Sequence, residues 1–127
     1  MQHALRSDQG ISLEAATDLW ALSNVIYIGP TGPSARILPE CEAFRLILHS
    51  PVIKEEQIFE LLHHESPSVA GYALELLISR GSQRVIEAAT VIGNRSEEVS
   101  MGIGCLICFR PLSAYAQSRI QAEQAAP

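Results

Sequence analysis

Apolar residues recur along most of this chain with the period of about 3.6 residues that is typical of an α-helix. The clearest apolar stripe has the spacing i, i+4, i+7 and i+8, and it consists of Val69, Ala73, Leu76 and Leu77. Ser66 and Pro67 precede this stripe as an N-cap and a first helical residue, and Gly81 follows it as a left-handed stop. The pattern predicts a helix from residue 67 to about residue 80. Its second half is apolar on nearly every side, so we expect this helix to be central.

Further segments have apolar positions at helical spacing, and they are residues 13–28, 39–49, 54–64, 83–92, 97–110 and 112–123. Two Gly-Pro pairs between Gly29 and Ser34 exclude both a helix and a central strand there, so we expect a loop. The run from Asn24 to Ile28 is the best candidate for a strand, but we favour a helix because the run continues a helical pattern. The predicted fold is therefore all-α, with about six or seven helices.

Two of these helices repeat along the chain. Residues 66–80 fall on residues 96–110 when they are shifted by 30 positions. The shift matches residues of the same type, and these pairs are Ser66 with Ser96, Val69 with Val99, Leu76 with Leu106 and Arg80 with Arg110. The same shift aligns the two helices that precede them. A helix pair that recurs after about 30 residues is typical of an α-solenoid, in which neighbouring pairs stack to bury their apolar faces.

The segment from Ser66 to Leu77, SPSVAGYALELL, resembles the second helix of a HEAT repeat of the phycobilisome-lyase type. In such helices a capping residue is followed by a valine and then by alanine and leucine at helical spacing. The resemblance covers about residues 53–110. The family often has aspartate at the cap and arginine after the valine, whereas this chain has serine at both caps and alanine or serine after the two valines. The resemblance implies a short right-handed α-α superhelix of stacked helix pairs, HEAT- or armadillo-like, with a scaffold role and no catalytic residues.

The length of 127 residues and the hydrophobic share of 47% predict one domain with a substantial core. We expect a single helical-repeat domain over residues 1–127, with 1–11 and 124–127 frayed. Residues 13–50 are expected to form an atypical first helix pair, and residues 53–81 and 83–111 are expected to form the repeat units.

Charge and cysteine usage narrow the class of protein. Nine basic and 14 acidic residues give a net charge of -5, which disfavours binding to nucleic acid. No apolar run approaches the roughly 18 residues that a membrane span needs, and the first residues do not resemble a signal peptide. Three cysteines are too few and odd in number for a disulfide framework. We therefore expect a cytoplasmic protein that contacts neither nucleic acid nor membrane.

Candidate metal and redox residues are better explained by packing. Cys105 and Cys108 form a CxxC pair, but it lies deep in a predicted helix, and a zinc site would need two more ligands. We favour core packing of both thiols over a redox or metal role. His63 and His64 are adjacent, so their side chains diverge by about 100° on a helix. Their position at a helix C-terminus favours an interaction with the helix dipole.

Two surfaces are candidates for contact with a partner. The loop from Gly29 to Ser34 lacks the ending of a P-loop and is interpreted as a turn, with Thr31 and Ser34 as possible partner contacts. Glu55, Glu56 and Glu60 give one predicted helix an acidic side, which is either a solvated face or a docking surface for a basic partner.

No Ser/His/Asp or Cys/His set suggests catalysis, since the only aspartates are Asp8 and Asp18. The sequence therefore predicts a non-enzymatic protein–protein interaction module, or a small scaffold or adaptor, without a cofactor. Its partner is expected to be a protein, and a homo-oligomer is included in this expectation. The alternative is a small-molecule-binding domain or small enzyme with a pocket near Trp20 and the 29–34 loop.

Overall fold

The computed structural model describes residues 12–23, 25–28, 39–103 and 106–125. In this part of the chain the elements are, in order, α1 (Leu13–Ser23), β1 (Val25–Ile28), α2 (Pro39–Leu48), α3 (Glu55–Glu60), the 3-10 turn η2 (Leu61–His63), α4 (Pro67–Ser79), α5 (Val85–Gly93), β2 (Glu98–Ile103), β3 (Leu106–Pro111) and α6 (Leu112–Ala125). The chain is mostly helical. The residues expected to fray lie outside the described part, except that α6 continues to Ala125.

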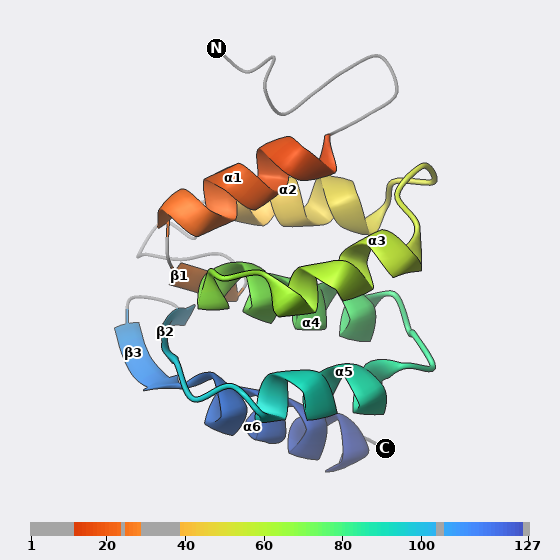
Figure 1. Cartoon of the computed structure of the whole chain (residues 1–127). Coiled ribbons are helices and arrows are strands. Elements are labelled where there is room, and N and C mark those ends of the chain that lie inside the picture. Colours follow the sequence, from red (N-terminus) through yellow and green to blue (C-terminus); the bar gives the residue numbers. More distant parts are fainter. Residues whose placement is uncertain (1–11, 24, 29–38, 104–105, 126–127) are drawn as a thin grey trace.

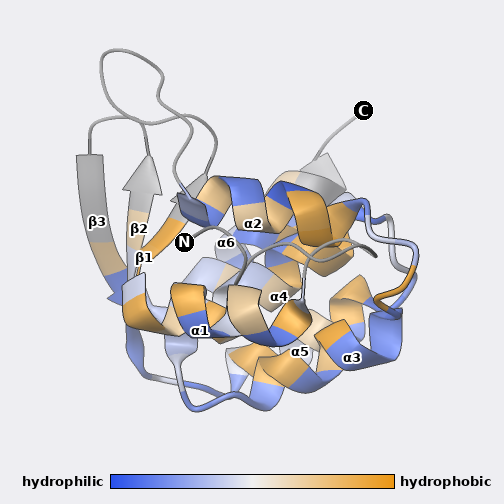
Figure 2. Cartoon of the chain, turned by 90° about the horizontal axis from the view of Figure 1, so that it is seen from above, coloured by the Kyte–Doolittle hydropathy of each residue, from blue (hydrophilic) through white to orange (hydrophobic). Residues whose placement is uncertain are grey.

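The helices lie in three layers, which Figure 1 shows as α1 with α2, α3 with α4, and α5 with α6. The middle helix α4 contacts both outer pairs, and every residue from Ser68 to Leu77 is buried. The prediction of a central helix is therefore confirmed. Its start is also confirmed, because Ser66 Oγ accepts a hydrogen bond from the Val69 N–H at 3.4 Å and Pro67 is the first helical residue. Seen from above, hydrophobic and hydrophilic residues alternate along the outer helices (Figure 2).

A three-stranded sheet joins the two outer layers. β1 pairs with β2 in parallel and β2 pairs with β3 antiparallel, so the strand order is β1-β2-β3. In this register Ser100 of β2 stands between Val25 of β1 and Phe109 of β3. Along the chain β1 follows α1, whereas the β2–β3 hairpin connects α5 to α6. The sheet is therefore formed by segments that belong to the first and the last layer.

The helix predicted over residues 97–110 is wrong, because this segment is the β2–β3 hairpin. On β2, Val99 and Met101 are buried whereas Glu98 and Ser100 are more exposed, which is the alternation of a strand. The shift of 30 residues therefore maps α4 onto a hairpin, and the predicted unit 83–111 consists of α5 and this hairpin. The expectation of an all-α fold is therefore confirmed only in part: the described chain is mostly helical, but it also contains a small three-stranded sheet.

The helix predicted over residues 13–28 is also too long. It ends at Ser23, and the chain continues as β1. The β-branched residues Val25 and Ile26 start this strand, where they pair with β2. Ile26 is fully buried, so the tertiary pairing with β2 overrides the helical spacing.

The core between α1, α2 and α4 is organised around Tyr72. Its ring stacks on Trp20 with centroids 4.7 Å apart and an interplanar angle of 18°, and its hydroxyl donates a hydrogen bond to the Val25 carbonyl at 2.9 Å. The indole N–H of Trp20 donates to the Glu40 carbonyl at 3.2 Å. Both polar groups are therefore satisfied inside the core, which is what burial of these side chains requires.

Arg80, the residue that ends α4, holds the connection between α2 and α3. Its guanidinium donates hydrogen bonds to the carbonyls of Ile53 at 2.9 Å, Ile47 at 2.6 Å and Ser50 at 3.3 Å. Three backbone acceptors that would otherwise need other partners are thus satisfied by one side chain. The middle layer is fixed to the first layer by this contact.

Candidate interaction surfaces

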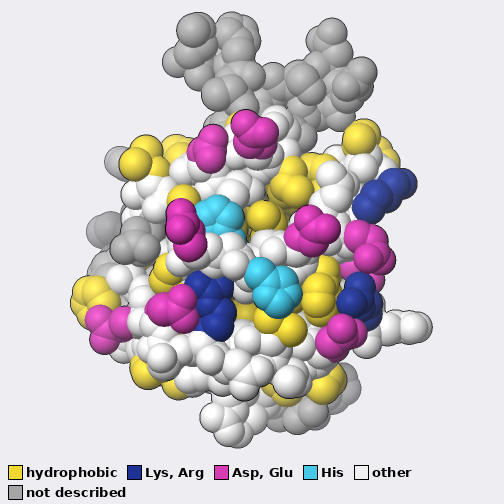
Figure 3. Space-filling view, viewed as in Figure 1, with side chains coloured by type: hydrophobic (Ala, Val, Ile, Leu, Met, Phe, Trp, Pro, Cys, Tyr) yellow, Lys and Arg dark blue, Asp and Glu magenta, His cyan; other side chains and the backbone are white. Residues whose placement is uncertain are grey.

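The acidic side of α3 lies on the face shown in Figure 3, where acidic side chains gather around basic ones and histidines. Glu56 and Glu60 are exposed and Glu55 is half-buried. The Glu56 carboxylate lies 3.8 Å from the guanidinium of Arg84, and because the Glu56 side chain is 82% exposed this ion pair is weak. Thr31 and Ser34, the other predicted partner contacts, lie outside the described residues.

Arg84 places a positive charge in the middle of this acidic side. Its guanidinium lies 3.9 Å from the centroid of the Phe59 ring, which is a cation–π contact between α5 and α3. It also donates two hydrogen bonds to the Glu87 carboxylate, at 3.2 and 3.1 Å. These hydrogen bonds raise the pKa of Arg84 and lower the pKa of Glu87. The acidic side is therefore partly neutralised by the chain itself, which weakens its attraction for a basic partner.

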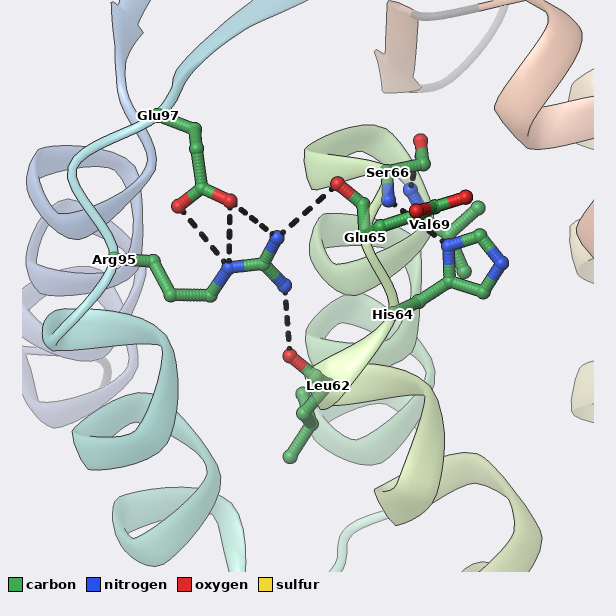
Figure 4. Close-up of polar contacts among 7 residues, drawn as sticks. All are labelled: Leu62, His64, Glu65, Ser66, Val69, Arg95 and Glu97. Carbon is green, nitrogen blue, oxygen red and sulfur yellow. Dashed lines mark hydrogen bonds and ion pairs between the residues drawn. The ribbon is translucent and has the colours of Figure 1, made fainter.

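Arg95 forms a second junction between layers, shown in Figure 4. Its guanidinium donates to the Leu62 carbonyl at 2.9 Å and to the Glu65 carbonyl at 3.4 Å, and it approaches the Glu97 carboxylate to 2.6 Å. The pKa of Glu97 is lowered, chiefly because Arg95 donates these hydrogen bonds to its carboxylate. With its side chain only 15% exposed, Arg95 ties the end of η2 to the start of the hairpin. Its donors are used within the chain, which is typical of a structural arginine.

The two histidines differ in their surroundings. His64 accepts a hydrogen bond at Nδ1 from the Ser66 N–H at 2.9 Å, so it supports the cap of α4 (Figure 4). His63 is exposed and ends η2, at the helix terminus where it was expected. Among the described residues, no three side chains of histidine, cysteine, aspartate or glutamate come together as a metal site would require.

The prediction that the CxxC pair lies in a helix is wrong. Cys108 belongs to β3, and Cys105 lies outside the described residues. Core packing of the two thiols stays a prediction, because the side chains of both residues lie outside the described part. Cys41 is half-buried on α2.

Trp20, the centre of the alternative small-molecule pocket, is a core residue. Its ring is fully buried against Tyr72, and its only polar group is bonded to the backbone of α2. The 29–34 loop lies outside the described residues. No observation at Trp20 therefore supports a ligand site, and the cavity described next lies on a different layer.

An open groove of about 570 Å³ runs between α5 and α6. We call it the α5–α6 groove, and its lining residues are all uncharged: Ile86, Ala89, Thr90, Gly93, Ser113, Ala114, Gln117, Ile120 and Gln121. The Ile86 side chain is 54% exposed there. Sequence analysis missed this groove, although uncharged positions at helical spacing on two segments are a visible signal.

The opposite end of the helix stack carries charges instead. Glu14 and Asp18 are exposed one helical turn apart on α1, and Figure 3 shows acidic side chains over this helix. On α2, Arg45 and Glu42 form an exposed ion pair at 3.8 Å. The surface of α1 and α2 therefore carries exposed charges, whereas the residues that line the groove between α5 and α6 carry none.

A buried polar cluster links α4 to α6. The carboxylate of Glu75 accepts a hydrogen bond from the Tyr115 hydroxyl and two from Arg119, of which one is 3.1 Å long. Burial raises the pKa of Tyr115 well above its usual value, and the neighbouring charge of Glu75 adds to this effect. In this cluster the charges of Glu75 and Arg119 balance each other, and Tyr115 adds a neutral donor. These contacts hold one side of α6 against α4, and residues on the opposite side of α6 line the groove.

No helix in the described part of the chain is both long and apolar enough to cross a bilayer. Comparisons with known proteins found no matching family model, no similar curated protein and no similar solved structure.

Proposed function

We propose that this protein is a non-enzymatic protein-interaction module that binds one helix of a partner protein in the α5–α6 groove. The observation that carries this proposal is the absence of charge from the nine residues that line the groove. On a chain with a net charge of -5, an uncharged and partly apolar hollow is suited to an apolar contact. An amphipathic helix that lays its apolar face into a hydrophobic groove is a recurring mode of recognition, and Ile86, Ala89, Ala114 and Ile120 supply the apolar groups here.

The packing inside the molecule supports a helix as the occupant. α4 contacts both α5 and α6 on their inner side, so these two helices already hold one helix between layers. On the outer side the lining positions of α5 run from Ile86 to Gly93 and those of α6 from Ser113 to Gln121. Each run covers roughly two helical turns, or about 11 Å. A partner helix would meet this surface with an uncharged stripe, because burying an unpaired charge is costly.

The HEAT-like resemblance is part of the same proposal. Three stacked helix pairs fit a short α-α superhelix in which α6, rather than residues 97–110, completes the last pair. In solenoids the terminal units present a polar outer face. The charged surface of α1 and α2 fits such a cap, whereas the α5–α6 end fits a surface that another protein covers. The acidic side of α3 remains a separate prediction for a basic partner.

Gly93 allows this proposal to be tested without disturbing the fold. No heavy atom lies within 4 Å of a Cβ added at Gly93, which lines the groove, so the side chain of Gly93→Leu begins in open space there. Leu22→Ser is the matched control, because Leu22 is 86% exposed on α1, far along the stack from the groove. Both variants and the wild type are used as bait in lysate of the source organism at low and high salt.

We expect one protein to be retained near equal stoichiometry by the wild type and by Leu22→Ser, and to be lost from Gly93→Leu. Retention that persists at high salt indicates the uncharged groove, whereas loss at high salt indicates the acidic side of α3. A partner that Gly93→Leu retains as well as the wild type does would contradict docking in the groove. Retention of no protein by the wild type would contradict the interaction module itself.

A further inference from the structure

The sheet ends at β3. This strand is the last in the order β1-β2-β3, and it lies at the margin of the molecule in Figure 1. α4 packs against β1 and β2, whereas the main contacts of β3 within the described residues are with β2 and with the start of α6. The outer edge of β3 pairs with no further strand of the described chain. An edge strand of this kind presents backbone donors and acceptors to a neighbouring chain.

The register determines which residues of β3 direct their backbone groups outward. Residues opposite each other on antiparallel strands alternate between two kinds of pair. In one kind the backbone N–H and C=O groups bond to the facing strand, and in the other kind they point away from that strand. The Leu112 N–H donates to the Glu97 carbonyl at 2.8 Å, which makes that pair a hydrogen-bonded one. Every second pair from there is also hydrogen-bonded, and these pairs include Val99 with Arg110 and Met101 with Cys108. The backbone groups of Arg110 and Cys108 therefore point toward β2. The backbone groups of Ile107 and Phe109 therefore point away from the sheet.

Pro111 fits this assignment. It stands opposite Glu98, at the next outward-pointing position of β3. A proline there lacks an N–H that would point outward, so the pairing with β2 loses no hydrogen bond. It also ends the row of outward donors, which leaves Ile107 and Phe109 as the two residues within β3 that can pair with a further strand.

We propose that a second copy of this chain occupies the edge, with β3 of each copy antiparallel to the other about a two-fold axis at Cys108. Ile107 of each copy then stands opposite Phe109 of the other. Both N–H and both C=O groups of these residues find partners across the axis. The result is one continuous sheet built from two three-stranded halves. This inference concerns a different surface from the α5–α6 groove and does not depend on it.

The outward residues Ile107 and Phe109 flank Cys108 symmetrically, which favours a second copy as the occupant, and the charges along the edge do not oppose it. Each copy carries a net charge of -5, but residues 106–111 contain no acidic residue. Arg110 is their only charged residue, and the two Arg110 residues would stand about 14 Å apart along the strands. That distance exceeds the screening length of about 8 Å at physiological ionic strength. Phe109, which is 65% exposed, would be covered beside the new strand pair.

Molar mass measured by light scattering tests the proposal. We expect the wild type to have twice the chain mass of 13.8 kDa over a wide range of protein concentration. Phe109→Lys is expected to be monomeric, because an edge lysine opposes strand addition. Phe109→Pro is also expected to be monomeric, since it removes an outward N–H and no bond to β2. If Phe109→Pro fails to fold, Phe109→Lys decides. A monomeric wild type, or a dimeric Phe109→Lys, overturns the proposal.

Cross-linking gives a second measurement. In the proposed dimer the two Cys108 residues form a pair whose Cα atoms are about 4.5 Å apart, within the range of a disulfide. Diamide, which accepts the two thiol hydrogens, should link the copies at Cys108. The cross-link is expected to be lost in Cys108→Ser and kept in Cys41→Ser. Cross-linking that persists in Cys108→Ser contradicts this axis. Gly93→Leu should leave the dimer intact, so a failure of the groove proposal is recognised separately.

Discussion

A Cβ added to Gly71 would lie 2.0 Å from Cδ1 of Ile26, so α4 packs directly against β1 at this point. Because Ile26 is fully buried in a close-packed core, its side chain has little room to shift away from an added Cβ. The contact explains why a glycine is present within the first turns of the central helix, where it otherwise costs about 1 kcal/mol relative to alanine. The helical layers and the sheet meet at this pair of residues.

Gly71→Ala is therefore expected to destabilise the protein by about 1–3 kcal/mol, because the clash outweighs the gain in helix propensity. Gly93→Ala is the matched control, since its Cβ meets no atom within 4 Å. It should stabilise the protein by up to about 1 kcal/mol. Urea denaturation measures both free energies of unfolding. A Gly71→Ala variant as stable as the wild type would show that α4 and β1 are not in this contact.

Arg80→Lys is expected to lower the free energy of unfolding by about 1–3 kcal/mol. A lysine keeps the charge, but its single ammonium group cannot reach the three carbonyls that the guanidinium bonds. Arg45→Lys, at an exposed residue of α2, serves as the control and should change stability by less than about 0.5 kcal/mol. Equal melting temperatures of the two variants would contradict the role of Arg80.

Tyr115 should make the protein sensitive to alkali. Its pKa is raised in the folded state, so its neutral form is kept while the unfolded chain ionises near pH 10. The contribution of neutral Tyr115 to the free energy of unfolding is thus fully present below about pH 10, and it falls as the pH rises beyond that value. Tyr115→Phe should be less stable at neutral pH and should lose stability less steeply in alkali. Denaturant titrations between neutral pH and alkali test this, and parallel curves for the two proteins would contradict it.

Glu97 should act in the opposite pH range. Because Arg95 lowers its pKa in the folded state, its contribution is present above the usual value of 4.5 and is lost as the pH falls through the lowered value. Glu97→Gln is expected to cost less than about 1 kcal/mol at neutral pH, since the side chain is 46% exposed. The difference from the wild type should vanish in acid. A difference that stays constant with pH would show that the ion pair is not its source.

Local signals in the sequence were enough to predict α4, because its cap, its first proline and its apolar stripe all lie within one segment. The hairpin could not be separated from a helix in this way. Val99 and Met101 fit a strand, but Val99 and Ile103 fit a helical stripe equally well, and short apolar runs are ambiguous. The partner that decides between them is β1, which lies far away in the sequence. Pairing over such a distance leaves no local trace.

The candidate surfaces were predictable to different degrees. The acidic positions of α3 were visible in the sequence, but the neutralising contact of Arg84 with Phe59 and Glu87 comes from another helix. The α5–α6 groove exists because the hairpin brings α6 back beside α5. The uncharged positions of both segments are visible in the sequence, but a helix predicted over residues 97–110 placed α6 elsewhere, so the proximity of α5 and α6 was not predicted.

The most direct test of the central claim is the dissociation constant of the captured partner for the wild type and for Gly93→Leu, measured by calorimetry at high salt. If the partner lies in the α5–α6 groove, Gly93→Leu should weaken binding by about tenfold or more while its melting temperature is unchanged or higher. A dissociation constant for Gly93→Leu equal to that of the wild type would contradict docking in the groove.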